Sequence, residues 1–265
     1  MANTSWNGSD KTANITLTGS SLIATATSSS TGGVRAADKQ QTGKFYWECT
    51  LTTISGVSSG VGVGGSGASL TANALSTTID CLMATNSGTI YVNTVSSGVT
   101  LGARASGDVI CIALDLTTTG SGLIWFRVGA AGNWNANAGN NPATGVGGIV
   151  CGFGPAIAAY PMWISNANST VCTANFGDTA FTGAVPSGFT SGFTSGATPA
   201  LNAAITQEAL EDWSSGGDAR LTQIALEQWV NPATGNVQAI LTQIALEEWC
   251  SVALLSADTR AMILA

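Results

Sequence analysis

The first 194 residues alternate short apolar runs with Gly, Ser, Thr and Asn, a pattern typical of β-structure. The runs are rich in Val, Ile, Thr and aromatic residues, and turn-forming residues separate them at regular intervals. Many short strands at such spacing predict an antiparallel β-sandwich or barrel. The predicted strands lie at 14–27 (two strands around Gly19), 44–54, 59–65, 78–85, 88–93, 108–117, 122–129, 148–154 and 170–177.

The composition changes near residue 195. A stretch of Gly, Ser, Thr and Pro is followed by Ala, Leu, Gln and Glu, which favour helices. We therefore predict a β-sandwich at 1–194, a linker at 195–203 and a C-terminal region at 204–265 that serves attachment or oligomerisation. The fold class is mainly β with a C-terminal extension of short repeats.

Three similar segments, here called the C-terminal repeats, fill that last region. They read ITQEALEDWS at 205–214, LTQIALEQWV at 221–230 and LTQIALEEWC at 241–250. On a helix of about 100° per residue, Leu221, Ile224 and Trp229 share one face about 140° wide. This spacing predicts short helices. The strand alternative stays open, with Ile224 and Leu226 then on one face.

Each repeat is too short to be a stable isolated helix. The repeats must therefore bury their apolar residues against the β domain, against one another or against another chain. A homo-oligomer or attachment to another protein follows from this requirement. The candidate attachment residues are Trp213, Leu221, Ile224, Trp229, Leu241, Ile244 and Trp249.

The distribution of charged and apolar residues argues against nucleic-acid binding and membrane insertion. Only 9% of the residues are charged, against about 25% in an average soluble protein. The 8 basic and 15 acidic residues give a net charge of −7 without any Lys/Arg cluster, which argues against a nucleic-acid partner. No apolar run reaches the roughly 18 residues of a membrane helix, so we expect no membrane insertion. The first residues combine neither a basic segment nor an apolar one, so we expect no signal peptide.

The sequence also argues against catalysis and cofactors. It contains no His, which removes the most frequent general base and metal ligand. Asp108, Asp115 and Asp178 each have a turn or capping explanation. We therefore expect neither an enzyme nor a cofactor or metal.

Six cysteines are spread over the chain, and none forms a C-x-x-C pair. Five lie in apolar, strand-like stretches and favour buried thiols that act as small hydrophobic residues. The alternative is that some of them pair in an oxidising exterior. Cys250 stands apart from the other five and is the candidate for an intermolecular disulfide.

The β region resembles the SPRY domain, a lectin-like β-sandwich, in its bacterial and phage form. The resemblance covers about residues 3–194. It rests on TGKFYWECTL (42–51), GVGVG (60–64), GDVICIALDLTTTGSGLIWFRVGAAGNWN (107–135), YPMW (160–163), NFGDTAF (175–181) and VPSGF (185–189). The chain departs from the family pattern after Trp-Phe, where a long Gly/Asn loop replaces the usual Asn-Gly turn.

The resemblance implies ligand binding by loops at one rim of the sandwich. The candidate ligand-binding residues are Trp134, Asn135, Asn137, Tyr160 and Trp163. Aromatic rings with neighbouring amides suit a glycan or a protein surface. The alternative is that Trp134 and Trp163 pack beneath their own loops.

The C-terminal repeats resemble short T-Q-x-A-x-E units of tailed-phage virion proteins. Together the two resemblances predict a phage virion structural protein, namely a fibre, a collar appendage or a capsid decoration. It would be made in the host cytoplasm, bind other virion proteins through its repeats and display a SPRY-type domain. The alternative is a module that binds a host-surface glycan or protein and has no structural role.

Overall fold

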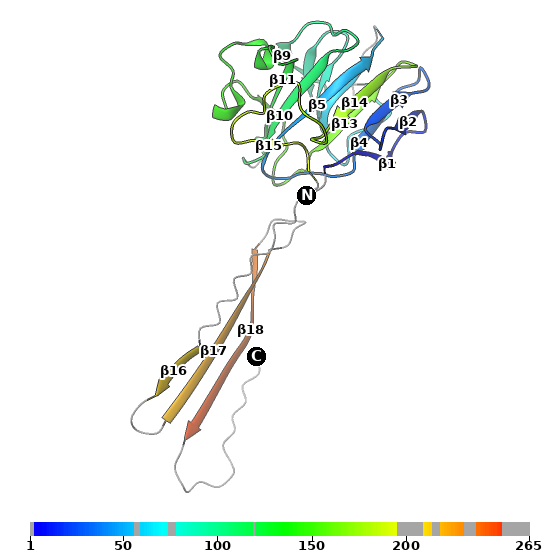
Figure 1. The fold of residues 1–265 in the computed structure, drawn as a ribbon. Coiled ribbons are helices and arrows are strands. Elements are labelled where there is room, and N and C mark those ends of the chain that lie inside the picture. The colour runs from blue at the N-terminus through cyan, green and yellow to red at the C-terminus, as the bar shows by residue number, and fades with distance from the viewer. Residues whose placement is uncertain are drawn as a thin grey trace. The chain divides into compact units, whose positions relative to one another are not determined.

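A computed structural model describes residues 3–55, 59–73, 78–118, 120–194, 209–213, 218–230 and 237–250. The chain divides into two compact units, Met1–Ala197 and Thr198–Ala265. The first unit is a mainly β fold in which two sheets, almost entirely antiparallel, pack as a sandwich (Figure 1). The second unit contains a separate three-stranded antiparallel sheet.

One layer of the sandwich is a seven-stranded sheet. Its strand order is β1-β4-β13-β6-β7-β8-β9, so β1 and β9 form its two edges. The strands are β1 (Trp6–Lys11), β4 (Gly32–Ala36), β6 (Gly60–Gly64), β7 (Asp80–Ala84), β8 (Thr89–Val92), β9 (Val95–Thr100) and β13 (Tyr160–Ser165).

The other layer is an eight-stranded sheet. Its order is β12-β11-β10-β5-β14-β3-β2, and β15 pairs with β5 in parallel. The strands are β2 (Ile15–Thr18), β3 (Ile23–Ala26), β5 (Lys44–Thr53), β10 (Val109–Asp115), β11 (Leu123–Val128), β12 (Ile149–Val150), β14 (Val171–Asn175) and β15 (Thr190–Ser191).

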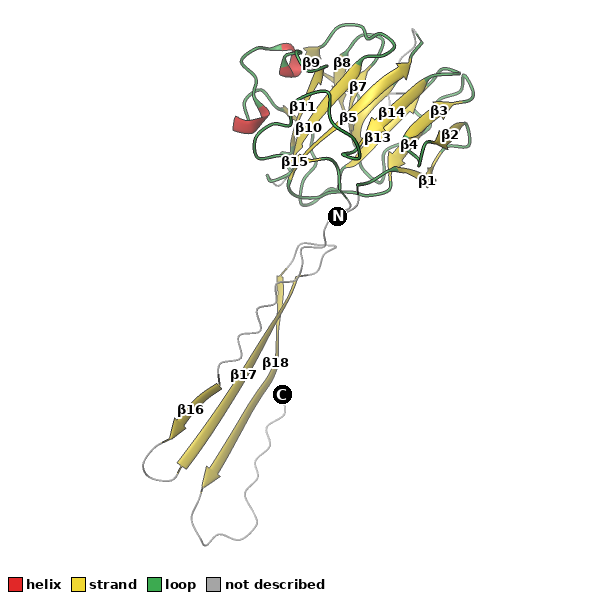
Figure 2. Ribbon diagram, in the orientation of Figure 1, coloured by secondary structure: helices red, strands yellow, loops and turns green. Residues whose placement is uncertain are grey.

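Strands with a clear apolar pattern lie where the sequence predicts them, including the two strands around Gly19. β1, β4, β9 and β13 were not predicted as strands. β4 and β9, with the sequences GGVRA and VSSGVT, contain too few apolar residues for a local signal, and their pairing with neighbours makes them strands. In the described part of this unit the helices are two short 3-10 turns, η1 (Trp134–Ala136) and η2 (Pro142–Thr144) (Figure 2).

The main core lies between the two sheets. Along β5, Phe45 and Trp47 belong to this core, whereas Tyr46 belongs to a cluster on the opposite face, as the alternation of a strand requires. Phe176 is fully buried and meets Trp6 edge-to-face, with ring centroids 5.2 Å apart. The aromatic motifs that resemble the SPRY pattern therefore build the interior.

Both sheets are also covered on their outer faces. Tyr46 and Trp125 lie in a cluster over the eight-stranded sheet, beneath residues that include Phe189. Leu82 and Met162 lie in a third cluster on the seven-stranded sheet. Because both faces are covered, strands such as β7 and β10 read as continuous apolar runs instead of alternating ones.

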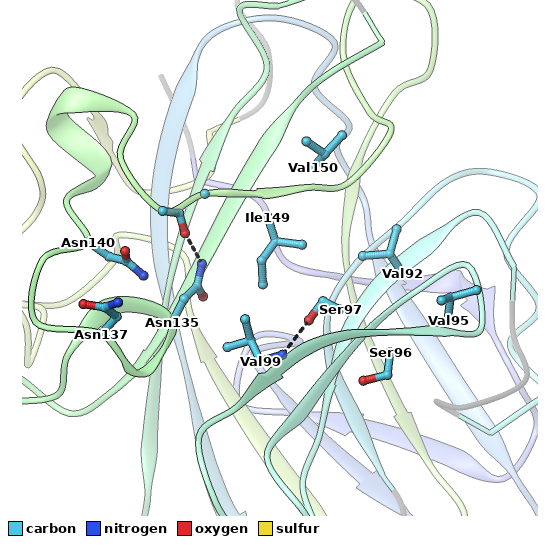
Figure 3. A pocket seen from close by; sticks show the side chains of 12 residues that line it. Val92, Val95, Ser96, Ser97, Val99, Asn135, Asn137, Asn140, Ile149 and Val150 are labelled. Atoms are coloured by element: carbon cyan, nitrogen blue, oxygen red, sulfur yellow. Dashed lines mark hydrogen bonds between the residues drawn. The ribbon is translucent and has the colours of Figure 1, made fainter.

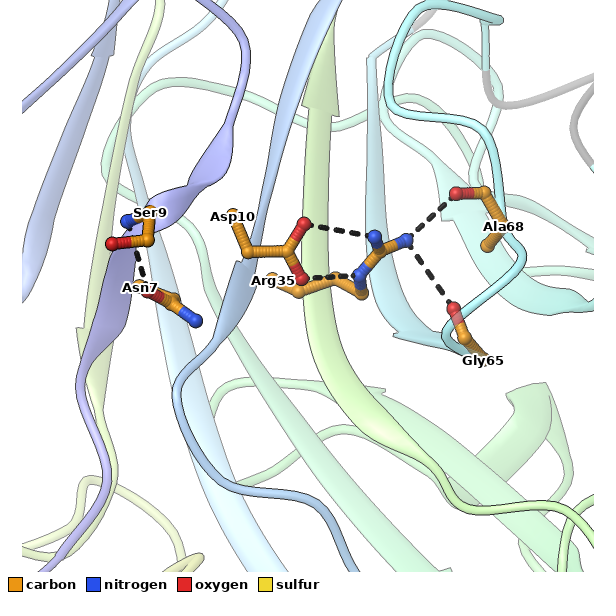
Figure 4. Close-up of polar contacts among 6 residues, drawn as sticks. All are labelled: Asn7, Ser9, Asp10, Arg35, Gly65 and Ala68. Carbon is orange, nitrogen blue, oxygen red and sulfur yellow. Dashed lines mark hydrogen bonds and ion pairs between the residues drawn. The ribbon is translucent and has the colours of Figure 1, made fainter.

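Arg35 on β4 ties three segments together (Figure 4). Its Nε and Nη2 donate to the two carboxylate oxygens of Asp10 at 2.7 and 2.8 Å. Its Nη1 donates to the carbonyls of Gly65 and Ala68 at 3.2 and 2.7 Å. One buried guanidinium thus holds the edge strand β1 and the loop after β6 against the same sheet.

Five cysteines are free and buried: Cys49, Cys81, Cys111, Cys151 and Cys172. This agrees with the interpretation of these thiols as small core residues. Cys250 lies at the end of β18, and its role in an intermolecular disulfide stays a prediction.

The second unit contains β16 (Ala209–Trp213), β17 (Asp218–Val230) and β18 (Val237–Cys250). The described residues of the repeats are therefore strands, where the sequence analysis favoured short helices and left strands open. Strand pairing supplies backbone partners along the described part of each repeat, which segments too short for stable isolated helices need.

Candidate binding groove

The loop that follows β11 forms one side of a groove and is positioned by Asn135. The Asn135 backbone is left-handed, with φ 46° and ψ 42°. Its Oδ1 accepts the backbone N–H of Phe126 at 2.8 Å, and its Nδ2 donates to the carbonyls of Ile124 and Gly147 at 3.2 and 2.9 Å. A single buried carboxamide therefore joins β11 to both ends of the loop, and it does so from a backbone geometry that Asn tolerates well.

Trp134 packs beneath this loop. Only 8% of the residue is exposed, and the guanidinium carbon of Arg127 lies 4.4 Å from its ring centroid. Tyr46 meets the same ring edge-to-face at 6.4 Å. Trp134 therefore packs beneath its own loop and is not free to stack on a ligand, because Arg127 and Tyr46 contact its ring.

Trp163 also lacks a surface for a ligand. It lies on β13, is 2% exposed and belongs to the core between the sheets. Tyr160, at the start of the same strand, is half-buried and pairs with Gly64. Neither residue lines the groove, so the five candidate ligand residues do not form one site.

An open, shallow groove of about 680 Å³ lies between the edges of the two sheets. One wall is the hairpin of β8 and β9, at the edge of the seven-stranded sheet, and the other is the loop after β11 with β12, at the edge of the eight-stranded sheet (Figure 3). The lining residues are Val92, Val95, Ser96, Ser97, Val99, Asn135, Asn137, Asn140, Gly147, Gly148, Ile149 and Val150.

The lining is aliphatic and amide-rich, with neither charged nor aromatic side chains. Val95 is 67% exposed and Val150 is 56% exposed, on opposite walls. Asn137 is exposed, and Asn140 donates to the Trp134 carbonyl at 2.9 Å. The groove therefore offers apolar contacts together with amide groups at its rim.

Close backbone packing shapes the same wall. At Gly147, which has φ 70°, an added Cβ would lie 1.8 Å from Oδ1 of Asn140. Any larger residue would displace the carboxamide and close part of the groove. The long Gly/Asn loop that departs from the SPRY pattern is thus the element that builds this wall.

Asp80 holds the opposite wall. The β8–β9 hairpin turns at Asn93 and Thr94, which have φ of 48° and 73°. The N–H of Asn93 donates to Oδ1 of Asp80 at 3.2 Å and to its carbonyl at 3.1 Å, and Oδ1 of Asn93 accepts the N–H of Asp80 at 3.2 Å. Asp80 is completely buried, and burial raises the pKa of its carboxyl to about 7.

Other acidic groups of the described sandwich have structural partners. Glu48 accepts the hydroxyl of Tyr46 at 2.6 Å and the N–H groups of Thr182 and Gly183 at 2.9 and 2.7 Å, which fastens the segment after β14 to the sheet. Asp115 accepts from Thr117 and pairs with Lys44 at 2.9 Å, as its predicted turn role requires. Among the described residues there is no group of three or more His, Cys, Asp or Glu arranged to hold a metal.

The attachment candidates lie in the separate three-stranded sheet. Ile224 is opposite Ile244, Leu241 is opposite Leu226, and Leu221 is opposite Glu247. Trp213 and Trp249 both pair with Ala219, from the two sides of β17, and Trp229 pairs with Gln238. Backbone pairing therefore brings all three repeats into one sheet. No helix among the described residues has the length and apolarity to cross a membrane.

Of the five candidate ligand residues, Asn135 and Asn137 line the groove, and most of the lining was not among the candidates. The missed residues lie on β8, β9 and β12 and near Asn140. Their sequences combine Val with Ser, Asn or Gly and resemble ordinary strand and turn residues. Only the meeting of two sheet edges makes them a site.

Comparisons with known proteins give structural similarities alone. No protein-family model and no curated protein matches the sequence. The SPRY domain of human HERC1 is similar, at 18% identity over 64% of this chain and 96% of that chain, with a TM-score of 0.48. A human SPRY domain is 17% identical over 63% of this chain and 98% of that chain, with a TM-score of 0.47. The TRIM65 PSpry domain is 11% identical over 65% of this chain and 92% of that chain, with a TM-score of 0.44. At TM-scores below 0.5, these similarities do not assign the chain to a family.

Proposed function

We propose that the β-sandwich is a protein-binding module whose groove takes an uncharged, aliphatic stretch of polypeptide. The observation that carries this proposal is the pair of exposed valines, Val95 and Val150, on facing walls of the groove. Exposed aliphatic residues that gather around a concavity are typical of an interaction site. The absence of charge in the lining favours a neutral ligand.

The lining favours a polypeptide over a glycan. Sugar rings bind best against aromatic faces, and the lining contains none, since Trp134 is covered by Arg127 and Tyr46. Aliphatic side chains and amides match the side chains and backbone of an extended chain. Of the two ligand classes predicted from the sequence, we therefore propose the protein.

We further propose that this module is a SPRY-type domain without enzymatic activity. The motifs at 42–51, 107–126 and 175–181 support the family. The resemblance implies binding by loops at a rim, and the groove lies beside such a loop. The structural partners of Glu48 and Asp115 support a binding role over catalysis.

The C-terminal repeats extend the proposal to a virion structural protein that attaches or oligomerises through them. Their repetition, the low charge of the chain and their resemblance to tailed-phage units support this role. An image of an intact particle at side-chain resolution tests it. We expect the repeats at a protein–protein contact and the sandwich facing outward; a particle without this chain would overturn the virion role.

The groove is tested with the full chain and a library of random twelve-residue peptides. Peptides selected on the parent protein should be aliphatic, and Val95→Asp or Val150→Asp should weaken their binding at least tenfold. A desolvated carboxylate in an apolar contact has this effect. Titration by fluorescence anisotropy with one selected peptide gives the dissociation constants.

Val146→Asp is the matched control. Val146 is 52% exposed, like Val150, but it lies outside the groove lining. Binding should be unchanged in this variant. An equal loss of peptide affinity in all three variants would show that the peptide does not bind in the groove. Binding on a glycan array that Val150→Asp abolishes would favour a sugar ligand instead.

A further inference from the structure

We propose that the free edge of β18 pairs antiparallel with β18 of a second copy of this chain, with Ile244 opposite Ile244 at a two-fold axis. This inference rests on the proposed oligomerisation role of the repeats and names the surface and the geometry. It follows from a register that the three repeats already share within one chain.

The ladder between β17 and β18 pairs two near-copies of one sequence. Ile224 and Ile244 occupy the same place in their repeats, and they lie directly opposite each other. On either side of this pair, Gln223 is opposite Ala245, and Ala225 is opposite Gln243. Over these three pairs the pairing is symmetric about the isoleucines, as a two-fold pairing of identical strands would be, and the register then shifts between Ala225 and Leu226.

The ladder between β16 and β17 repeats the same arrangement. Ala209 of the first repeat corresponds to Ala225 of the second, and it lies opposite Gln223. The Ala of one repeat thus meets the Gln of the next in both ladders, although the repeats are separated by different intervals. The register follows from the repeat sequence, since connecting segments of unequal length give the same result.

β18 pairs with β17 along one edge, and its other edge has no described partner. It is the last strand in the order β16-β17-β18, so no described strand pairs with its outer edge (Figure 1). Among the described residues, this fourteen-residue strand has no partner along its outer edge, and such an edge is a template for another strand. The strand that fits it is another copy of the repeat, because this sequence already pairs with itself twice.

Charge selects the antiparallel arrangement. In the proposed register Glu247 lies opposite Leu241 of the second copy, and Glu248 lies opposite Ile240, so no acidic residue faces another. A parallel pairing in register would place Glu247 beside Glu247 and Glu248 beside Glu248, which is unfavourable between adjacent strands. The antiparallel ladder avoids this repulsion along its whole length.

The register gives an unexpected result for Cys250. It would lie opposite Gln238 of the second copy, so the two Cys250 residues would be at opposite ends of the ladder. The dimer proposed here therefore does not form through a Cys250–Cys250 disulfide, although Cys250 was the candidate for an intermolecular disulfide. The distance between the two Cys250 residues therefore reports on the register, and cross-linking can measure it.

Charge complementation tests the proposal in the full chain. We expect a dimer for the parent by native mass measurement and sedimentation, and at least a tenfold weaker dimer for Ile244→Lys and for Ile244→Glu alone. A mixture of the two variants should restore a heterodimer, because opposite charges then meet at the axis. Restoration also shows that the substituted repeats remain folded.

Ile224→Lys is the matched control, since it disturbs the same pair within the chain and leaves the outer edge of β18 unchanged. Its dimer should persist. A monomeric parent, equal effects of the two lysine variants, or a mixture that stays monomeric would each overturn the proposal.

A second measurement reads the register directly. In a Cys250→Ser background, Ile244→Cys should form a cross-linked dimer with diamide, which accepts the two electrons and two protons released by the thiols. The parent Cys250 should not cross-link between copies; if it does while Ile244→Cys stays uncross-linked, the register is wrong. Peptide binding in the groove should be unchanged in all these variants, which separates failure of the dimer from failure of the binding module.

Discussion

Replacing Asp80 with Asn should remove a pH dependence from the stability of the sandwich. The Asp80 carboxyl is completely buried; its Oδ1 accepts the N–H of Asn93, and its Oδ2 accepts no hydrogen bond from any described residue. Burial therefore raises its pKa from 3.8 to about 7. Asn has nearly the same shape and carries no charge at any of these pH values.

The magnitude follows from the two pKa values. One pKa unit corresponds to about 1.4 kcal/mol, so the difference between 3.8 and about 7 corresponds to about 4 kcal/mol. The native carboxyl keeps its proton to higher pH than the unfolded chain does. Its contribution to stability is therefore fully present below pH 3.8 and is lost as the pH rises through about 7.

The assay is urea unfolding of the full chain at pH 5 and pH 8.5, followed by tryptophan fluorescence. We expect the parent to lose a few kcal/mol of unfolding free energy between these values, and Asp80→Asn to lose much less. The sequence has no His, so no imidazole contributes in this range. Asp178→Asn, at an exposed carboxylate, is the control and should behave like the parent.

Equal pH dependence in the parent and in Asp80→Asn would refute this reasoning. It would mean that water or a neighbouring group stabilises the ionised carboxyl. Because Asp80 bonds Asn93 in the β8–β9 turn, the parent should also bind groove peptides more weakly at pH 8.5 than at pH 5.

Two further substitutions test the contacts that position the loops. Glu48→Gln should lower the free energy of unfolding by about 2–3 kcal/mol in urea at pH 7. The N–H of Thr182 donates to the Glu48 carboxylate in the parent, and in the variant it would meet the N–H groups of the new amide. An unchanged unfolding midpoint would contradict this. Asn135→Ala should lower the free energy of unfolding by about 3–4 kcal/mol. It removes the side-chain hydrogen bonds to the carbonyls of Ile124 and Gly147, and it places Ala in a left-handed backbone conformation. It should also weaken peptide binding, and full binding would show that the loop is held by other contacts.

Local patterns accounted for much of the sandwich. Along β5, period-two alternation puts Phe45 and Trp47 on one face and Tyr46 and Glu48 on the other, as the structure has them. Asp115 was predicted as a turn acceptor, and Thr117 confirms it. These features depend on residues near one another in sequence, and period-two alternation and turn chemistry report such features directly.

The candidate site was predicted only in part. Asn135 and Asn137 line the groove, whereas Trp134 and Trp163 are packing residues. An aromatic residue in a loop gives the same sequence signal whether its ring meets a ligand or an internal arginine. The packing of Arg127 against Trp134 decides between them, and that contact joins neighbouring elements only after folding.

The sequence by itself determined that the first 194 residues are mainly β and that the C-terminal region contains three similar segments. The tertiary structure alone decided where two sheet edges meet to form a groove and that Asp80 is buried beneath a hairpin. The reason is physical. Alternation and composition are properties of neighbours along the chain, whereas cavities, desolvation and strand register depend on groups that only the fold brings together.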